Sequence, residues 1–161
     1  MKVAFQRVAA AAMASCLALM ACLVFVNVVL RYGFGAGIAA SEELSRLLFV
    51  WMVFIGATAA YPMGEHMAFT SLLLKLRTRP RVFAAATALI RALVLLACLL
   101  VAWGAWQQFV VGLDSQSVVL GYPAALLPLP ALLSSVAIGA MALVELVRRE
   151  PLDFGHATDV E

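Results

Sequence analysis

Residues 41–57 read SEELSRLLFVWMVFIGA, a cluster of charged residues placed directly before an apolar run. The uncharged stretch lasts from residue 47 to residue 64, about 18 residues, the length at which a membrane-spanning helix becomes the default interpretation. Ser41 is a candidate N-cap, and the two glutamates that follow it suit the positive end of a helix dipole. This stretch therefore predicts a helix that begins at a membrane surface.

The composition of the whole chain is that of an integral membrane protein. Of its 161 residues, 65% are apolar and only 12% are charged, and the mean hydropathy is +1.03. A soluble domain carries about a quarter of its residues as charged side chains. The net charge of +2 gives no indication of a nucleic-acid partner, so membrane lipid is the surface that we expect the chain to contact. Three cysteines lie in apolar runs without a C-x-x-C motif, which indicates small core residues rather than a disulfide, zinc or redox site: Cys16, Cys22 and Cys98.

Four apolar segments predict an all-α integral membrane protein with four transmembrane helices, short outer loops and a single membrane domain. The expected spans cover about residues 8–30, 42–63, 82–111 and 126–148, followed by a polar tail over 149–161. The first segment also has the basic head and apolar run of a cleaved signal peptide. Because its apolar run continues to Leu30, we interpret it as a retained first span.

The distribution of lysine and arginine predicts the orientation of the chain. One side of the membrane would receive eight basic residues: Lys2, Arg7, Lys75, Arg77, Arg79, Arg81, Arg148 and Arg149. The two loops on the other side hold Arg31 alone. The positive-inside rule then places both termini in the cytoplasm.

Four charges gather at the outer ends of the first two spans. They are Arg31, Glu42, Glu43 and Arg46. Glu42 and Glu43 precede Arg46 by four and three residues, the spacings at which helix side chains meet. We predict an ionic cluster that pins this helical hairpin. Solvated charges at the level of the headgroups are the alternative.

Few residues inside the spans invite a functional interpretation. Arg91 lies about nine residues into the third span, where it could pair with a carboxylate or face a substrate, but snorkelling to the headgroups is favoured. Asn27 is expected to donate a hydrogen bond between helices. Gly56 and Ala60, four residues apart, would let another helix approach closely.

Several function classes lack the residues that they need. A four-span proton-coupled exporter needs a carboxylate near the midplane, and a four-helix membrane cytochrome needs histidines within its spans. Here His66 stands at a helix end and His156 in the tail. No catalytic, metal-binding or cofactor-binding arrangement is evident, so we do not expect an enzyme. The chain is expected to act as a membrane subunit through a partner.

Five short motifs in order resemble the small membrane subunit of tripartite ATP-independent periplasmic (TRAP) transporters. They are NVVLRY at 27–32, SEELSR at 41–46, the run at 51–56, His66-Met67, and LGYP at 120–123 before a proline-led last span. The resemblance covers roughly residues 8–148. One difference is that AFTS follows His66-Met67, where the family commonly has a polar, charged run.

The resemblance implies a sodium-driven transporter of three parts in the bacterial inner membrane. A periplasmic binding protein would deliver an organic acid, such as a dicarboxylate or a sialic acid, to a large membrane subunit. The small subunit would support the large one without holding substrate or ions. The alternative is an independent four-helix membrane protein, either a homo-oligomeric exporter or a structural bundle.

Overall fold

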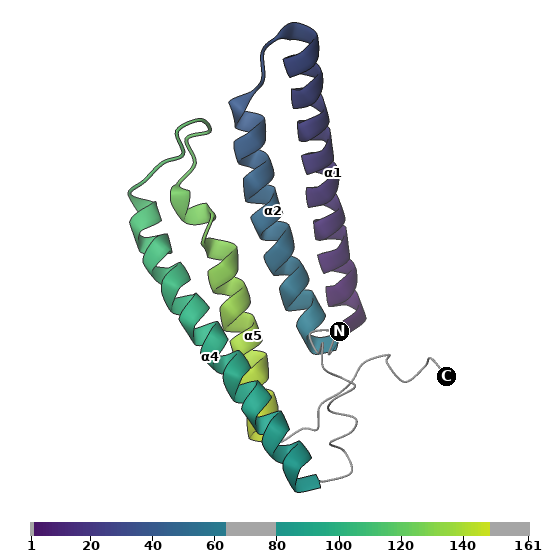
Figure 1. Ribbon diagram of the computed structural model, residues 1–161, viewed down its shortest axis with the longest axis vertical. Helices are drawn as coiled ribbons and strands as arrows, with labels where there is room; N and C mark the ends of the chain where they lie inside the picture. The colour runs from purple at the N-terminus through teal and green to yellow at the C-terminus, as the bar shows by residue number, and fades with distance from the viewer. Residues whose placement is uncertain (1, 64–79, 149–161) are drawn as a thin grey trace, which may run out of the picture.

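The computed structural model describes residues 2–63 and 80–148, which fold almost entirely into α-helix (Figure 1). The long helices are α1 (Lys2–Phe34), α2 (Ala39–Ala60), α4 (Pro80–Leu113) and α5 (Leu129–Arg148). The 3-10 turn η1 (Tyr61–Met63) follows α2, and η2 (Ala124–Leu126) precedes α5. Four helical segments are long and apolar enough to cross a membrane, and no strand occurs in the described ranges. The prediction of an all-α fold with four spans is confirmed.

α1 and α4 are longer than a bilayer requires. At 33 and 34 residues, each measures about 50 Å, whereas the hydrocarbon core is about 30 Å thick. α1 begins at Lys2, before the predicted start of the span near residue 8. Helical hydrogen bonding involves the backbone, so it is not limited to the apolar residues. Helices of this length tilt in the bilayer or project beyond it.

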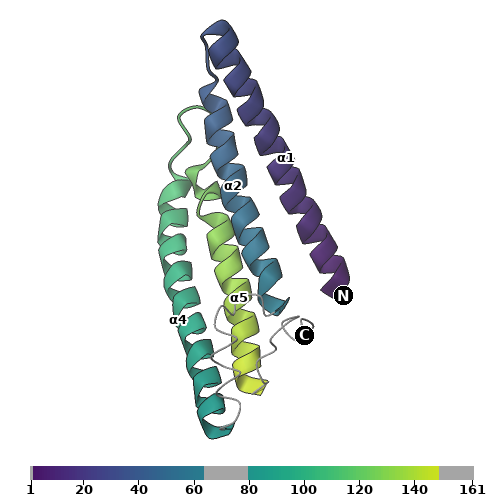
Figure 2. The same cartoon turned by 45° about the vertical axis from the view of Figure 1, so that its right-hand side comes forward.

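The helices form two antiparallel hairpins that lie side by side. α1 packs against α2 in the first hairpin, and α4 packs against α5 in the second. The two hairpins meet mainly where α2 contacts α5. Figures 1 and 2 show the resulting order α1–α2–α5–α4, a row rather than a closed bundle.

The interior of this row is built from small side chains. In the described part of the chain, the buried apolar residues are five alanines together with Gly112 and Pro130; the alanines are Ala9, Ala59, Ala105, Ala125 and Ala142. Among the residues that the structure describes, no large side chain is fully buried, and many Leu, Val, Phe and Trp side chains point outward. The outward side chains suit a lipid environment, in which apolar surface costs nothing to expose.

The start of α2 differs from the prediction. Ser41 is not the N-cap, because the helix begins at Ala39 with Ile38 as the capping residue. The Ile38 N–H donates to the Asn27 side-chain oxygen of α1 at 2.7 Å, which gives the N–H of the capping residue itself a partner, and no side chain caps the first turn. The Ser41 hydroxyl instead donates to the Leu23 carbonyl of α1 at 2.8 Å.

Gly112 allows the end of α4 to approach η2 closely. A Cβ atom at this position would lie 2.5 Å from the backbone nitrogen of Ala125 and 2.8 Å from its Cα. The second hairpin therefore needs glycine at this position. Its connecting loop is ordered by hydrogen bonds from Ser117 N–H to Tyr122 O and from Ala124 N–H to Ser115 O, both 2.8 Å.

Candidate functional site

The outer ends of α1 and α2 carry the four charges for which an ionic cluster was predicted. The structure does not form that cluster: over residues 2–63 and 80–148, no ion pair within 4 Å joins any two of them. Arg31, Glu42 and Arg46 are exposed, and Glu43 is half-buried. Exposed charges gain little from pairing, which explains why they stay apart.

Hydrogen bonds between side chains and backbone groups link the two helices of the first hairpin instead. Asn27 accepts the Ile38 N–H, and Ser41 donates to the Leu23 carbonyl, so two polar side chains link the outer halves of α1 and α2. Asn27 was expected as a donor between helices. It acts as an acceptor because the first turn of a helix leaves N–H groups without a helical partner.

Glu43 and Arg46 face the second hairpin through Tyr122. Burial raises the pKa of Tyr122, the nearby Glu43 carboxylate raises it further, and Arg46 lowers it. The Tyr122 hydroxyl and Glu43 Oε2 are both buried without a hydrogen-bond partner among the described residues. A Tyr–Glu–Arg group thus lies where the outer end of α2 meets the loop between α4 and α5.

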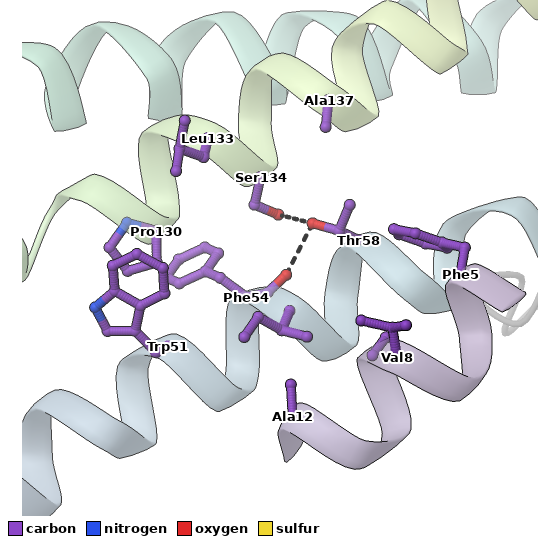
Figure 3. A pocket seen from close by; sticks show the side chains of 12 residues that line it. Phe5, Val8, Ala12, Trp51, Phe54, Thr58, Pro130, Leu133, Ser134 and Ala137 are labelled. Carbon is purple, nitrogen blue, oxygen red and sulfur yellow. Dashed lines mark hydrogen bonds between the residues drawn. The ribbon is translucent and has the colours of Figure 1, made fainter. Parts of the chain in front are cut away.

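Trp51 and Thr58 of α2 each form a hydrogen bond to the last span. The Trp51 indole N–H donates to the Leu126 carbonyl of η2 at 3.2 Å. The hydroxyls of Thr58 and Ser134 form a 2.8 Å hydrogen bond, and Thr58 also donates to the Phe54 carbonyl of its own helix at 2.8 Å (Figure 3).

Arg91 is buried rather than snorkelling. Its residue is only 4% exposed, its Nη1 donates to the Glu145 carbonyl at 3.0 Å, and its Nε lies 3.6 Å from Glu145 Oε2. The Tyr61 hydroxyl donates to the same carboxylate oxygen at 3.4 Å. A second Tyr–Glu–Arg group therefore joins η1, α4 and α5 near the end of the molecule that carries both described chain ends.

Of the remaining predicted site residues, the structure describes Gly56 and Ala60 but not His66. Gly56 packs inside the first hairpin, because a Cβ there would lie 3.1 Å from the Met13 sulfur of α1. Ala60 ends α2 and is half-buried. His66 lies outside the described residues, as do the polar tail and the basic loop up to residue 79, whereas Arg81 belongs to α4.

A cavity of about 350 Å³ lies between α1, α2 and α5 (Figure 3). Four residues from each helix line it, and nearly all of its wall is apolar. Its polar side chains are Trp51, Thr58 and Ser134, whose N–H and hydroxyl groups are engaged in the hydrogen bonds between helices described above. The described residues contain no group of three or more His, Cys, Asp or Glu that could hold a metal ion.

Sequence reasoning did not single out Trp51, Thr58, Ser134 or Tyr61 as contacts between helices. Thr58 and Ser134 carried a signal, since a hydroxyl within an apolar span usually finds a partner on its own or a neighbouring helix. Their pairing could not be predicted because it depends on α2 and α5 being neighbours.

These observations define a multi-pass helical membrane protein in which several polar side chains join its own helices. The family model "Tripartite ATP-independent periplasmic transporters, DctQ component" matches residues 20–151. Two Haemophilus influenzae proteins that bear the name TRAP transporter small permease protein are similar to the chain. One is 37% identical over 133 residues, covering 83% of this chain and 81% of the relative. The other is 33% identical over 143 residues, covering 89% and 83%.

The chain belongs to the DctQ family of TRAP transporter components. It is a small permease subunit of a transporter, and its four apolar helices agree with a multi-pass protein of the inner membrane.

Proposed function

We propose that the chain is the small, non-catalytic membrane subunit of a sodium-driven TRAP transporter. The transporter imports an organic acid, such as a dicarboxylate or a sialic acid, delivered by a periplasmic binding protein. The chain packs against the large membrane subunit and supports it. Both of its termini lie in the cytoplasm, and its two outer loops lie near the docking surface of the binding protein.

The apolar cavity is the observation that carries the accessory role. An organic acid needs a cation or several hydrogen-bond donors, because burying an unpaired carboxylate is very costly. The cavity offers neither, since Trp51, Thr58 and Ser134 already have partners within the chain. Arg91 is turned to Glu145 and is not among the residues that line the cavity.

The arrangement of the helices in a row favours the proposal that a partner protein lies beside the chain in the membrane. A row leaves two broad faces uncovered, and the apolar residues that it buries within the described ranges are small, mostly alanines. Such a chain gains rigidity when a larger membrane protein covers one face. The polar loop between α4 and α5, with Val118 fully exposed, offers a contact surface outside the membrane.

Transport by reconstituted components tests the proposal. The large subunit and the binding protein are placed in proteoliposomes with and without this chain, and uptake of radiolabelled organic acids is followed under a sodium gradient. We expect uptake only when all three components are present, and loss of uptake when the gradient is collapsed.

Two results would contradict the proposal. Full sodium-driven uptake without this chain would show that the chain is not an obligatory subunit. Uptake by the purified chain alone would show that it is an independent transporter and not an accessory one.

A further inference from the structure

We propose that the bilayer crosses the row of helices obliquely, so that the surface in contact with lipid hydrocarbon is a slanted band. The end of the molecule with the connecting loops, residues 35–38 and 114–123, is called the loop end here, and the opposite end the terminal end. The band lies nearer the loop end on α1 and nearer the terminal end on α4. This placement requires only membrane insertion and holds for either orientation of the termini.

Contacts between neighbouring helices fix how far each helix is shifted along its axis. Figure 1 shows the second hairpin displaced toward the terminal end relative to the first. Three contacts link residues that lie at the same level: Ser41 with Leu23 between α2 and α1, Thr58 with Ser134 between α2 and α5, and Gly139 with Cys98 between α5 and α4. Because each residue of a helix rises about 1.5 Å, these links set the level of every other residue.

The basic residues near the terminal end follow a steep slope along the row. Arg7 of α1 lies close to the level of Thr58. Arg148 of α5 lies about 21 Å beyond Ser134, the partner of Thr58, toward the terminal end. The backbone of Arg81, the second residue of α4, lies about 33 Å beyond the same level. The end of the apolar region thus shifts by about 30 Å from α1 to α4.

The charged residues near the loop end slope in the same direction. Arg31 lies about 12 Å beyond Leu23, whereas Arg46 lies about 8 Å below Ser41, the partner of Leu23. Arg31 is therefore about 20 Å further toward the loop end than Arg46. Asp114, which follows α4, lies close to the level of Arg46. Charged side chains outside a protein interior stay at the headgroups or in water, so both sets mark a membrane boundary.

The two slopes define one tilt. Neighbouring helices lie about 8–10 Å apart, so a row of four is about 27 Å wide between its outer axes. Shifts of about 20 and 30 Å over this width incline the bilayer by roughly 40° to an upright placement. At this tilt, a helix of about 50 Å such as α4 covers roughly 38 Å of depth, close to the hydrocarbon core with its headgroup layers. The excess length of α1 and α4 is thereby explained.

Exposed apolar side chains argue against an upright row. An upright core of about 30 Å would be centred between Trp51 and Thr58, whose hydrogen bonds mark the middle of the contact between α2 and α5. Phe25 of α1 and Leu89 of α4 would then lie several Å outside it, at opposite ends. Phe25 is 69% exposed and Leu89 is 61% exposed, and exposing such side chains to water is unfavourable. In the slanted band, both face hydrocarbon.

The mean tilt of the helices tests the placement without any substitution. The full-length chain is reconstituted in oriented bilayers, and the dichroism of its amide I band is measured with polarised infrared light. We expect a mean tilt of roughly 40°, twice the average of about 20° for membrane helices. A mean tilt below about 30° would overturn the proposal.

The depth of single positions provides a second test. With Cys16, Cys22 and Cys98 replaced by alanine, a spin label is attached to a cysteine at Phe25 or Leu89, and collisions with oxygen and with a water-soluble nickel chelate are compared in vesicles. Three further positions serve as references: Leu17 and Leu99, which lie in hydrocarbon in either placement, and Val118, which is fully exposed in the loop.

We expect labels at positions 25 and 89 to collide mainly with oxygen, as labels at 17 and 99 do. Circular dichroism checks the helix content of each variant. If labels at 25 and 89 instead collide with the nickel chelate as the label at 118 does, the row stands upright in the chain alone and the proposal is wrong. Neither measurement involves sodium-driven uptake, so this placement and the proposed function can fail independently.

Discussion

Arg91 places a positive charge against the apolar interior of the second hairpin, and its partners explain how α4 tolerates it. A cation in a membrane span is costly unless it is paired or reaches the headgroups. Arg91 meets both the carboxylate and the backbone carbonyl of Glu145, so one residue of α5 supplies two acceptors. Tyr61 adds η1, the turn that directly follows α2, to the same group.

Removing this cation should weaken the packing of all three helices. Losing one partner of a fully buried pair typically costs about 3–5 kcal/mol, and we expect roughly 1–3 kcal/mol for Arg91→Leu because Glu145 is 31% exposed. Thermal unfolding of the purified chain in detergent measures the loss. Arg91→Leu combined with Glu145→Leu should recover part of it, since no unpaired charge remains. Equal stability of Arg91→Leu and the native chain would show that the pair is not structural.

The hydrogen bond between Thr58 and Ser134 offers a second test at this scale. Thr58→Val keeps the shape of the side chain but removes the contact with α5, so we expect a loss of about 0.6 kcal/mol, the mean for such bonds in membranes. Thr87→Val is the matched control, because the buried Thr87 hydroxyl bonds to Phe83 of its own helix. A larger loss for Thr87→Val than for Thr58→Val, again by thermal unfolding, would contradict the assignment.

At the scale of helices, the sequence predicted the number and type of elements but not their order in space. Length and apolarity are local properties, and they suffice to identify four spans. The contact of α2 with α5 joins residues more than 70 positions apart, such as Thr58 and Ser134, and no local pattern encodes it. The start of α2 was missed for the same reason, because the N–H of its capping residue, Ile38, bonds to Asn27 on α1.

The turn of the second hairpin yields an element-scale prediction from two glycines. Gly112→Ala would push a methyl group into the backbone of η2, so we expect a loss of about 1–3 kcal/mol as α4 and α5 separate. Gly104→Ala, in the same helix with nothing within 4 Å, should cost nothing and can gain about 0.5–1 kcal/mol from better helix propensity. Thermal unfolding of both variants in detergent tests the contrast, and equal stabilities would argue against the close approach of α4 to η2.

The whole molecule is a row of helices held together at one central contact. Groups of Tyr, Glu and Arg lie at both ends of that contact: Tyr122 with Glu43 and Arg46 at one end, and Tyr61 with Glu145 and Arg91 at the other. Between these two groups, α1, α2 and α5 surround an apolar cavity. Hydrogen bonds between polar side chains therefore help to hold the two hairpins together, while lipid or a partner protein must cover their outer faces.

The distribution of lysine and arginine predicts the orientation of this row in the membrane, with both termini in the cytoplasm. With Cys16, Cys22 and Cys98 replaced by alanine, single cysteines are introduced at Val118, which is 100% exposed, and at Thr78 in the basic loop. We expect an impermeant maleimide applied outside the inner membrane to label position 118 alone, and both positions after permeabilisation. The reverse pattern would invert the topology.

The same experiment can show why the chain adopts this orientation. If lysine and arginine retain the inner loop in the cytoplasm, replacing the four basic residues of that loop with glutamine removes much of the bias, leaving the basic residues near the termini to oppose inversion. The four replacements are Lys75→Gln, Arg77→Gln, Arg79→Gln and Arg81→Gln. A fraction of the chains should then label at position 78 from outside. Unchanged labelling would mean that the residues near the termini suffice to set the orientation, and the inner loop would then be free to serve another role.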